Sequence, residues 1–164
     1  MARALLVGCG CRGRQLGGSL LDQGWAVRGT SRRPEGLAAI EAAGIEAAEA
    51  DPAWPGTLLD LVGDVTVVFW LLGSAAGEDE DVEAIHGPRL ERLLEKLVDT
   101  PVRGFVYEAA GTVSPHRRER GESLVRAAAA TWRIPIEIVA ADPTDLDAWV
   151  EAMSSAAGLL ALPR

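Results

Sequence analysis

The stretch Leu5–Gly18, LLVGCGCRGRQLGG, decides the fold of this 164-residue chain. An apolar run ends here in a turn whose positions 8 to 18 hold five glycines, two cysteines and two arginines. Two kinds of site fit such a turn: a metal or redox site built on Cys9 and Cys11, or a backbone cradle for a phosphate. The pattern of the rest of the chain favours the phosphate cradle.

The glycines of this turn form the pattern G-x-G-x-x-G, between a predicted strand and a predicted helix. In this context the first glycine permits the tight turn and the second lets the backbone approach a pyrophosphate. The third allows close packing of helix and strand, and the helix N-terminus supplies N–H groups and a favourable dipole. We therefore predict a dinucleotide site at this turn. The alternative is that the glycines only form a tight turn and bind no ligand. The predicted cofactor-binding residues of this turn are Gly8, Cys9, Gly10, Cys11, Arg12 and Gly13.

Short apolar runs alternate with helical patterns along the whole chain. Strands are predicted over residues 4–7, 25–30, 45–50, 65–72, 102–109 and 136–141. Helices are predicted over residues 11–23, 35–43, 56–62, 88–98, 119–132 and 144–160. Such alternation is typical of a parallel sheet with helices on both faces. We predict a single α/β domain over residues 1–164, a doubly wound Rossmann-type fold with about six parallel strands.

The end of the second predicted strand indicates which dinucleotide is bound. A site that prefers NAD usually carries a carboxylate here for the ribose hydroxyls. This chain instead has hydroxyls and guanidinium groups, which suit a 2′-phosphate because arginine forms charge-assisted, often bidentate bonds to phosphate. We therefore predict NADP as the preferred cofactor over NAD. The alternative is a solvated turn that binds no ligand. The residues concerned are Thr30, Ser31, Arg32 and Arg33, with Arg12 as a further cation.

Composition and charge narrow the class of protein. Hydrophobic residues make up 48% of the chain and charged residues 24%, as is usual for globular domains. The net charge of −8 argues against general nucleic-acid binding, which needs a basic face. No apolar run approaches the roughly 20 residues of a membrane span, and the N-terminus lacks the pattern of a secretory signal, so we expect a cytoplasmic protein. The acidic run Gly77–Glu83 is expected to be a solvated loop that enters a helix.

From residue 4 to about residue 141, and most strongly up to Asp51, the sequence resembles the extended and atypical short-chain dehydrogenases/reductases, including NAD-dependent epimerase/dehydratase-like proteins. The resemblance rests on GCGCRG, VRGTSR and the later segments FWLLGSA and GFVYEAAGTVSP. It implies a Rossmann fold, with Asp51 near the adenine and Leu72 and Gly73 along the cofactor. Helices after the fourth and fifth strands build a dimer interface in that family, so a homodimer is expected.

The catalytic pattern of that family is missing. Its Tyr-x-x-x-Lys pair has no counterpart, because the only tyrosine, Tyr107, lies inside the fifth predicted strand and is followed four residues later by Gly111. Ala109 and Ala110 stand where a catalytic hydroxyl is expected. The remaining candidates for a proton donor are Thr112, Ser114 and His116. A basic helix entrance without catalytic function is the alternative for His116 and its arginine neighbours.

Other chemistry-bearing residues are given structural roles. No metal site is predicted, because a zinc site needs four ligands and only two cysteines are present. Cys9 and Cys11 are expected to be small turn residues, although a thiol at a helix N-terminus can have a lowered pKa and be redox active. Glu108 is expected on the surface or as a cap, with a general base as the alternative. We expect burial, not a base-stacking surface, for the five tryptophans, Trp25, Trp54, Trp70, Trp132 and Trp149.

Two functions remain open. The first is an NADP(H)-binding oxidoreductase acting on a small carbonyl-type substrate. The second is a module that keeps the fold for cofactor sensing or interaction without turnover, motivated by the missing Tyr/Lys pair and by the near absence of a substrate-binding region.

Overall fold

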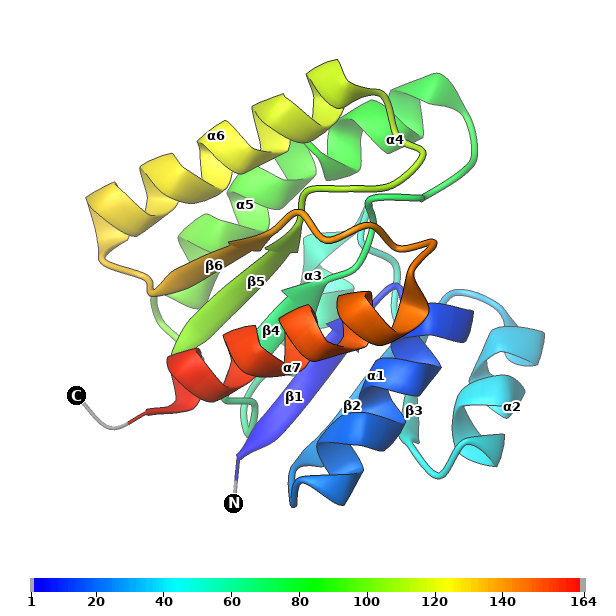
Figure 1. Cartoon of the computed structure of the whole chain (residues 1–164). Coiled ribbons are helices and arrows are strands. Elements are labelled where there is room, and N and C mark those ends of the chain that lie inside the picture. Colours follow the sequence, from blue (N-terminus) through cyan, green and yellow to red (C-terminus); the bar gives the residue numbers. More distant parts are fainter. Residues whose placement is uncertain (1, 163–164) are drawn as a thin grey trace.

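A computed structural model describes residues 2–162, and Figure 1 shows a sheet with helices on both faces. The six strands are all parallel and lie in the order β3-β2-β1-β4-β5-β6. This order reverses direction between β1 and β4, which is the Rossmann arrangement. The predicted fold class is therefore confirmed. The strands are β1 (Arg3–Val7), β2 (Ala26–Ser31), β3 (Glu46–Glu49), β4 (Val67–Trp70), β5 (Gly104–Glu108) and β6 (Ile136–Val139).

Seven helices connect the strands or follow them within the described residues. Pro34, Pro55, Pro88 and Pro115 each stand in the first turn of a helix, where a missing N–H costs nothing. The helices are α1 (Cys11–Asp22), α2 (Pro34–Ala42), α3 (Pro55–Leu59), α4 (Asp79–Ile85), α5 (Pro88–Leu97), α6 (Pro115–Trp132) and α7 (Leu146–Ala161).

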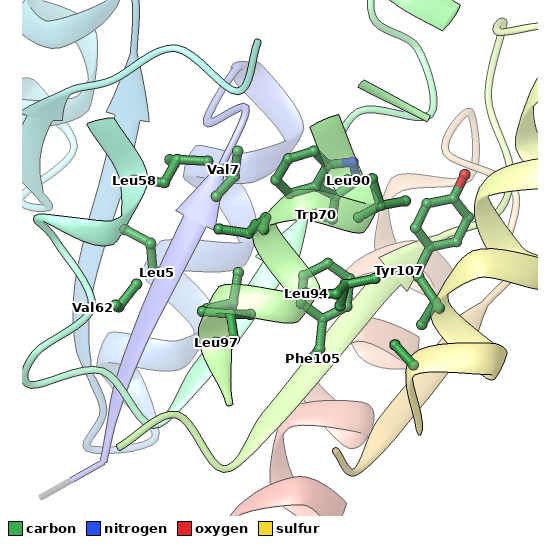
Figure 2. Packing of buried hydrophobic residues seen from close by; sticks show 14 of the residues in the cluster. Leu5, Val7, Leu58, Val62, Trp70, Leu90, Leu94, Leu97, Phe105 and Tyr107 are labelled. Atoms are coloured by element: carbon green, nitrogen blue, oxygen red, sulfur yellow. The ribbon is translucent and has the colours of Figure 1, made fainter. Parts of the chain in front are cut away.

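The alternation of side chains along the strands creates a core on each face of the sheet. Leu5 and Val7 point toward α3, α5 and α6, and Figure 2 shows this core with the leucines of α5 packed on Trp70 and Phe105. Ala4 and Leu6 point the other way, toward α1, α2 and α7. Because both faces are covered, the central strand β4 is apolar and buried at every position, as its run in the sequence predicts.

Two predicted elements differ from the structure. The acidic run is not a loop, because Asp79 begins α4; acidic residues in a first turn are stabilised by the helix dipole. The helix α6 begins at Pro115, four residues before the predicted start, because proline suits a first helical turn even though the segment after it is strongly basic. No helix of residues 2–162 combines the length and apolarity that crossing a membrane requires.

Candidate functional site

The turn between β1 and α1 has the backbone geometry of an anion site. Gly8 has φ +84°, and a Cβ there would lie 2.7 Å from the Leu71 carbonyl oxygen. The Cys9 N–H donates to the Thr30 carbonyl at 3.2 Å, which ties the turn to β2. Within the described residues, the N–H groups of Cys11, Arg12 and Gly13 have no hydrogen-bond partner. These first-turn groups are the ones that bind phosphate oxygens at a helix N-terminus.

Cys9 fills the space beneath this turn. Its side chain is 4% exposed, and a Cβ on Gly29 of β2 would lie 2.7 Å from its sulfur. Burial raises the pKa of the Cys9 thiol to about 12, partly offset by the charge of Arg14. The lowered pKa considered for a redox pair is therefore wrong for Cys9, since the thiol is desolvated rather than activated by the helix. Cys11 is exposed, and both cysteines are free.

A cavity of about 570 Å³ opens beside the glycine turn, at the carboxyl ends of the strands. Open α/β sheets bind ligands at this edge, where the strand order reverses. The cavity brings together most of the predicted cofactor residues, namely Gly8, Cys9, Gly10, Arg12, Thr30, Ser31, Arg32, Asp51 and Leu72. It does not bring Cys11, Gly13, Arg33 or Gly73 to its wall.

Four arginines line the cavity in a chain that is acidic overall: Arg12, Arg14, Arg32 and Arg89. None of them has a carboxylate partner among residues 2–162, whereas Arg3 and Arg28 are paired with Glu46 and Asp64. Cations left unpaired in a concave site attract anions, and their combination with free backbone N–H groups suits a ligand with more than one phosphate.

Asp51 follows β3 and forms part of the cavity wall. Its carboxylate accepts a hydrogen bond from the Ala53 N–H at 2.9 Å, and its own N–H donates to the Thr57 hydroxyl at 2.9 Å. These bonds fix the short segment that carries Trp54, which also lines the cavity. Trp54 is 60% exposed, so its predicted burial is wrong; Trp70 and Trp149 are buried as predicted. The segment around Trp54 has no periodicity that would place the ring in a core.

Glu108 lies at the end of β5 and is only 3% exposed, which contradicts its predicted surface position. Its carboxylate accepts hydrogen bonds from the Gly73 N–H and the Trp149 indole, each at 2.8 Å. Burial raises the pKa of Glu108, while these two donors and Arg12 oppose the rise. The residue connects the loop after β4 to α7, a contact that the sequence does not reveal because its tryptophan partner is 41 positions away.

A second buried chain of hydrogen bonds lies on the other face of the sheet. The His86 Nε2–H donates to the Leu72 carbonyl at 2.8 Å, and Nδ1 lies 2.6 Å from the Tyr107 hydroxyl. The same hydroxyl oxygen also lies 3.2 Å from the Arg118 carbonyl oxygen, and the Arg118 side chain donates to the Ala109 carbonyl. Burial lowers the pKa of His86, which favours the neutral ring with Nδ1 as acceptor.

The predicted proton donors lie on the loop after β5 and at the start of α6. Thr112, Ser114 and His116 are exposed and lie outside the cavity wall. Ser114 is the N-cap residue of α6, and the Thr112 N–H donates to the Ser74 hydroxyl at 3.2 Å. No cluster of three or more His, Cys, Asp or Glu side chains among the described residues could hold a metal ion.

No protein-family model matches the chain, and no curated protein does so. Solved structures do. The chain is 19% identical to UDP-glucuronic acid 4-epimerase from Bacillus cereus, solved with NAD; the match covers 83% of this chain and 54% of that one, at a TM-score of 0.66. It is 16% identical to vestitone reductase from alfalfa (Medicago sativa), matching 84% of this chain and 56% of that one at a TM-score of 0.63.

A third structure is the triphenylmethane reductase of Citrobacter sp. complexed with NADP(H), at 16% identity, 82% of this chain, 48% of that one and a TM-score of 0.60. The chain thus spans about half the length of these proteins. At such identities the likeness shows the fold, and it agrees with the strand order described above.

Proposed function

We propose that this protein binds NADP(H), with the pyrophosphate at the N-terminus of α1 and the 2′-phosphate at the end of β2. The free N–H groups of Cys11, Arg12 and Gly13 suit the pyrophosphate. Ser31 and Arg32 suit the 2′-phosphate, with Thr30, Arg12 and Arg33 nearby in sequence or space. The binding of NAD or NADP(H) by similar structures supports a nicotinamide dinucleotide as the ligand class.

The observation that carries the proposal is the coincidence of the free backbone donors with the unpaired cavity arginines. The cradle also fits close approach of a phosphate, because Gly10 has open space where a Cβ would stand. Asp51 and Leu72 line the same cavity, and Gly73 lies next to Leu72 along the β4 loop.

An oxidoreductase acting on a small carbonyl-type substrate is the first candidate for the activity of the cofactor-bound protein. The nicotinamide would supply the hydride when bound. The chain would supply a proton from Thr112, Ser114 or His116, which lie on the loop after β5, at the carboxyl edge of the sheet, and at the start of α6. Homodimer formation belongs to this proposal and is checked by the mass of the protein in solution.

The second candidate is a module that binds the cofactor without turnover. It is favoured by one observation: the three predicted proton donors are outside the cavity wall. Screening NADPH oxidation against carbonyl and quinone compounds separates the candidates, since turnover that is lost in His116→Ala excludes the module.

Calorimetric titration with NADPH and NADH tests the proposed binding directly. We expect saturable binding of NADPH and weaker binding of NADH, because only NADPH engages the arginines with its 2′-phosphate. Absence of NADPH binding at millimolar concentration would end the proposal.

A further inference from the structure

We infer that this chain recognises the adenosine half of the dinucleotide alone, with Trp54 and Arg89 as its base-binding pair. The ligand class is then the 2′-phosphorylated adenosine diphosphates, with or without nicotinamide. The inference rests on the proposed NADP(H) site and goes beyond it, because it states that this chain contacts the adenosine half of the ligand and not the nicotinamide half.

The first support is the origin of the cavity wall. Its residues come from the β1–α1 turn, the end of β2, the segments that follow β2 and β3, the β4 loop, and the helices α1, α2, α4 and α5. Within the described residues, no side chain from position 90 onward contributes to it. The cavity therefore lies over one half of the sheet edge, where the ends of β2 and β3 bring adenosine-binding positions together.

The second support is a closed seam on the other side of the cavity, where the β4 loop meets the β5 loop. A Cβ at Gly73 would collide with the Ala110 carbonyl oxygen. The Gly73 N–H donates to Glu108 at 2.8 Å, and its carbonyl accepts from the Val113 N–H at 2.9 Å. Because both backbone groups of Gly73 are engaged within the protein, they are not free to bind the second half of a dinucleotide.

The third support is the pair at the outer rim of the cavity. Trp54 is 60% exposed although it lines the cavity, and the Arg89 guanidinium lies 5.2 Å from the centre of its ring. Arg89 has no carboxylate partner among residues 2–162. An exposed indole and a guanidinium plane are surfaces on which a purine base stacks.

The test compares 2′-phospho-ADP-ribose with NADP⁺, which differ by the nicotinamide, using titration calorimetry on the whole chain. We expect their dissociation constants to agree within about threefold, and nicotinamide mononucleotide to show no binding. If 2′-phospho-ADP-ribose binds more than about threefold more weakly than NADP⁺, and NADP⁺ itself still binds, this inference is overturned and the proposed function stands. Failure of both to bind overturns the proposed function itself.

Variants test the base-binding pair. Trp54→Ala should weaken both ligands about tenfold and by the same factor, and Trp54→Phe should restore most of the affinity because a stacking ring is kept. Arg89→Ala should weaken both ligands, while Arg92→Ala is the matched control, an exposed arginine of α5 outside the cavity. Unchanged affinity in Trp54→Ala, with native circular dichroism, would refute the pair.

Discussion

Gly121 lies inside α6, a helix of 18 residues, and faces the phenol of Tyr107. A Cβ at this position would collide with the Tyr107 hydroxyl. That hydroxyl is held by His86 and the Arg118 carbonyl, so it has little room to move. Packing against Tyr107 therefore requires a glycine at this position, although alanine has the higher helix propensity.

Alanine substitutions in two helices test this explanation. We expect Gly121→Ala to lower the free energy of unfolding by about 1–3 kcal/mol through overpacking. Gly18→Ala in α1 is the control, since a Cβ there meets open space, and it should stabilise the protein by about 0.5–1 kcal/mol. Urea unfolding measures both, and a stabilising Gly121→Ala would contradict the contact with Tyr107.

The two cysteines should differ sharply in reactivity. At pH 8 we expect a thiol reagent to label Cys11 quickly and Cys9 only on unfolding, because Cys9 is buried and its pKa is raised to about 12. Labelling of Cys11→Ser in native and denaturing conditions isolates Cys9. Rapid labelling of the native Cys11→Ser variant would show that Cys9 is accessible.

At the scale of an element, the end of β2 and the start of α2 place two neighbouring arginines differently. Arg32 lines the cavity, whereas Arg33 is the N-cap residue of α2 and lies outside the cavity wall. Sequence alone treats the two as equivalent. The structure separates them because β2 ends at Ser31 and the chain turns into the helix at Pro34.

Single substitutions should separate the two arginines in function. We expect Arg32→Ala to weaken NADPH binding by about 2 kcal/mol, the range of a charge-assisted bond, and to leave NADH binding nearly unchanged. Arg33→Ala is the adjacent comparison and should have the smaller effect on NADPH. If Arg32→Ala weakens the binding of NADPH and of NADH equally, this side chain does not select the 2′-phosphate.

At the scale of the whole molecule, His86 links the β4 loop, β5 and α6 through buried hydrogen bonds. Burial lowers the pKa of His86 below 6.5, so above this pH the ring is neutral in folded and unfolded chains alike. As the pH falls below 6.5, the unfolded chain takes up the proton first and the folded state loses stability. The loss is at most about 1.4 kcal/mol per pH unit and ends at the folded-state pKa.

Unfolding by urea between pH 7 and pH 5 measures this loss. We expect His86→Asn to be less stable than the wild type at pH 7 and to lose less further stability as the pH falls. The raised pKa of Glu108 acts in the opposite direction above pH 4.5, but it is common to both proteins and cancels in the difference. His116→Asn, which removes the exposed histidine, is the control. If the free energy of unfolding changes with pH equally in the wild type and in His86→Asn, this role of His86 is contradicted.

The fold class could be predicted because its signals are local: apolar runs for strands covered on both faces, and glycines at turns. The glycine turn between β1 and α1 and the position of the end of β2 could be predicted for the same reason. Arg14, Trp54 and Arg89 could not, because they reach the cavity from separate elements. The packing of α5 on α3 brings Arg89 to Trp54, and no sequence pattern specifies that contact.

A crystal structure with NADP⁺ bound is the decisive measurement for the proposed site, because the proposal states which atoms hold the cofactor. We expect pyrophosphate oxygens within hydrogen-bond distance of the N–H groups of Cys11, Arg12 and Gly13, and the 2′-phosphate beside Ser31 and Arg32. A dinucleotide bound away from the glycine turn, or with its adenosine over β5 and β6, would contradict the proposal.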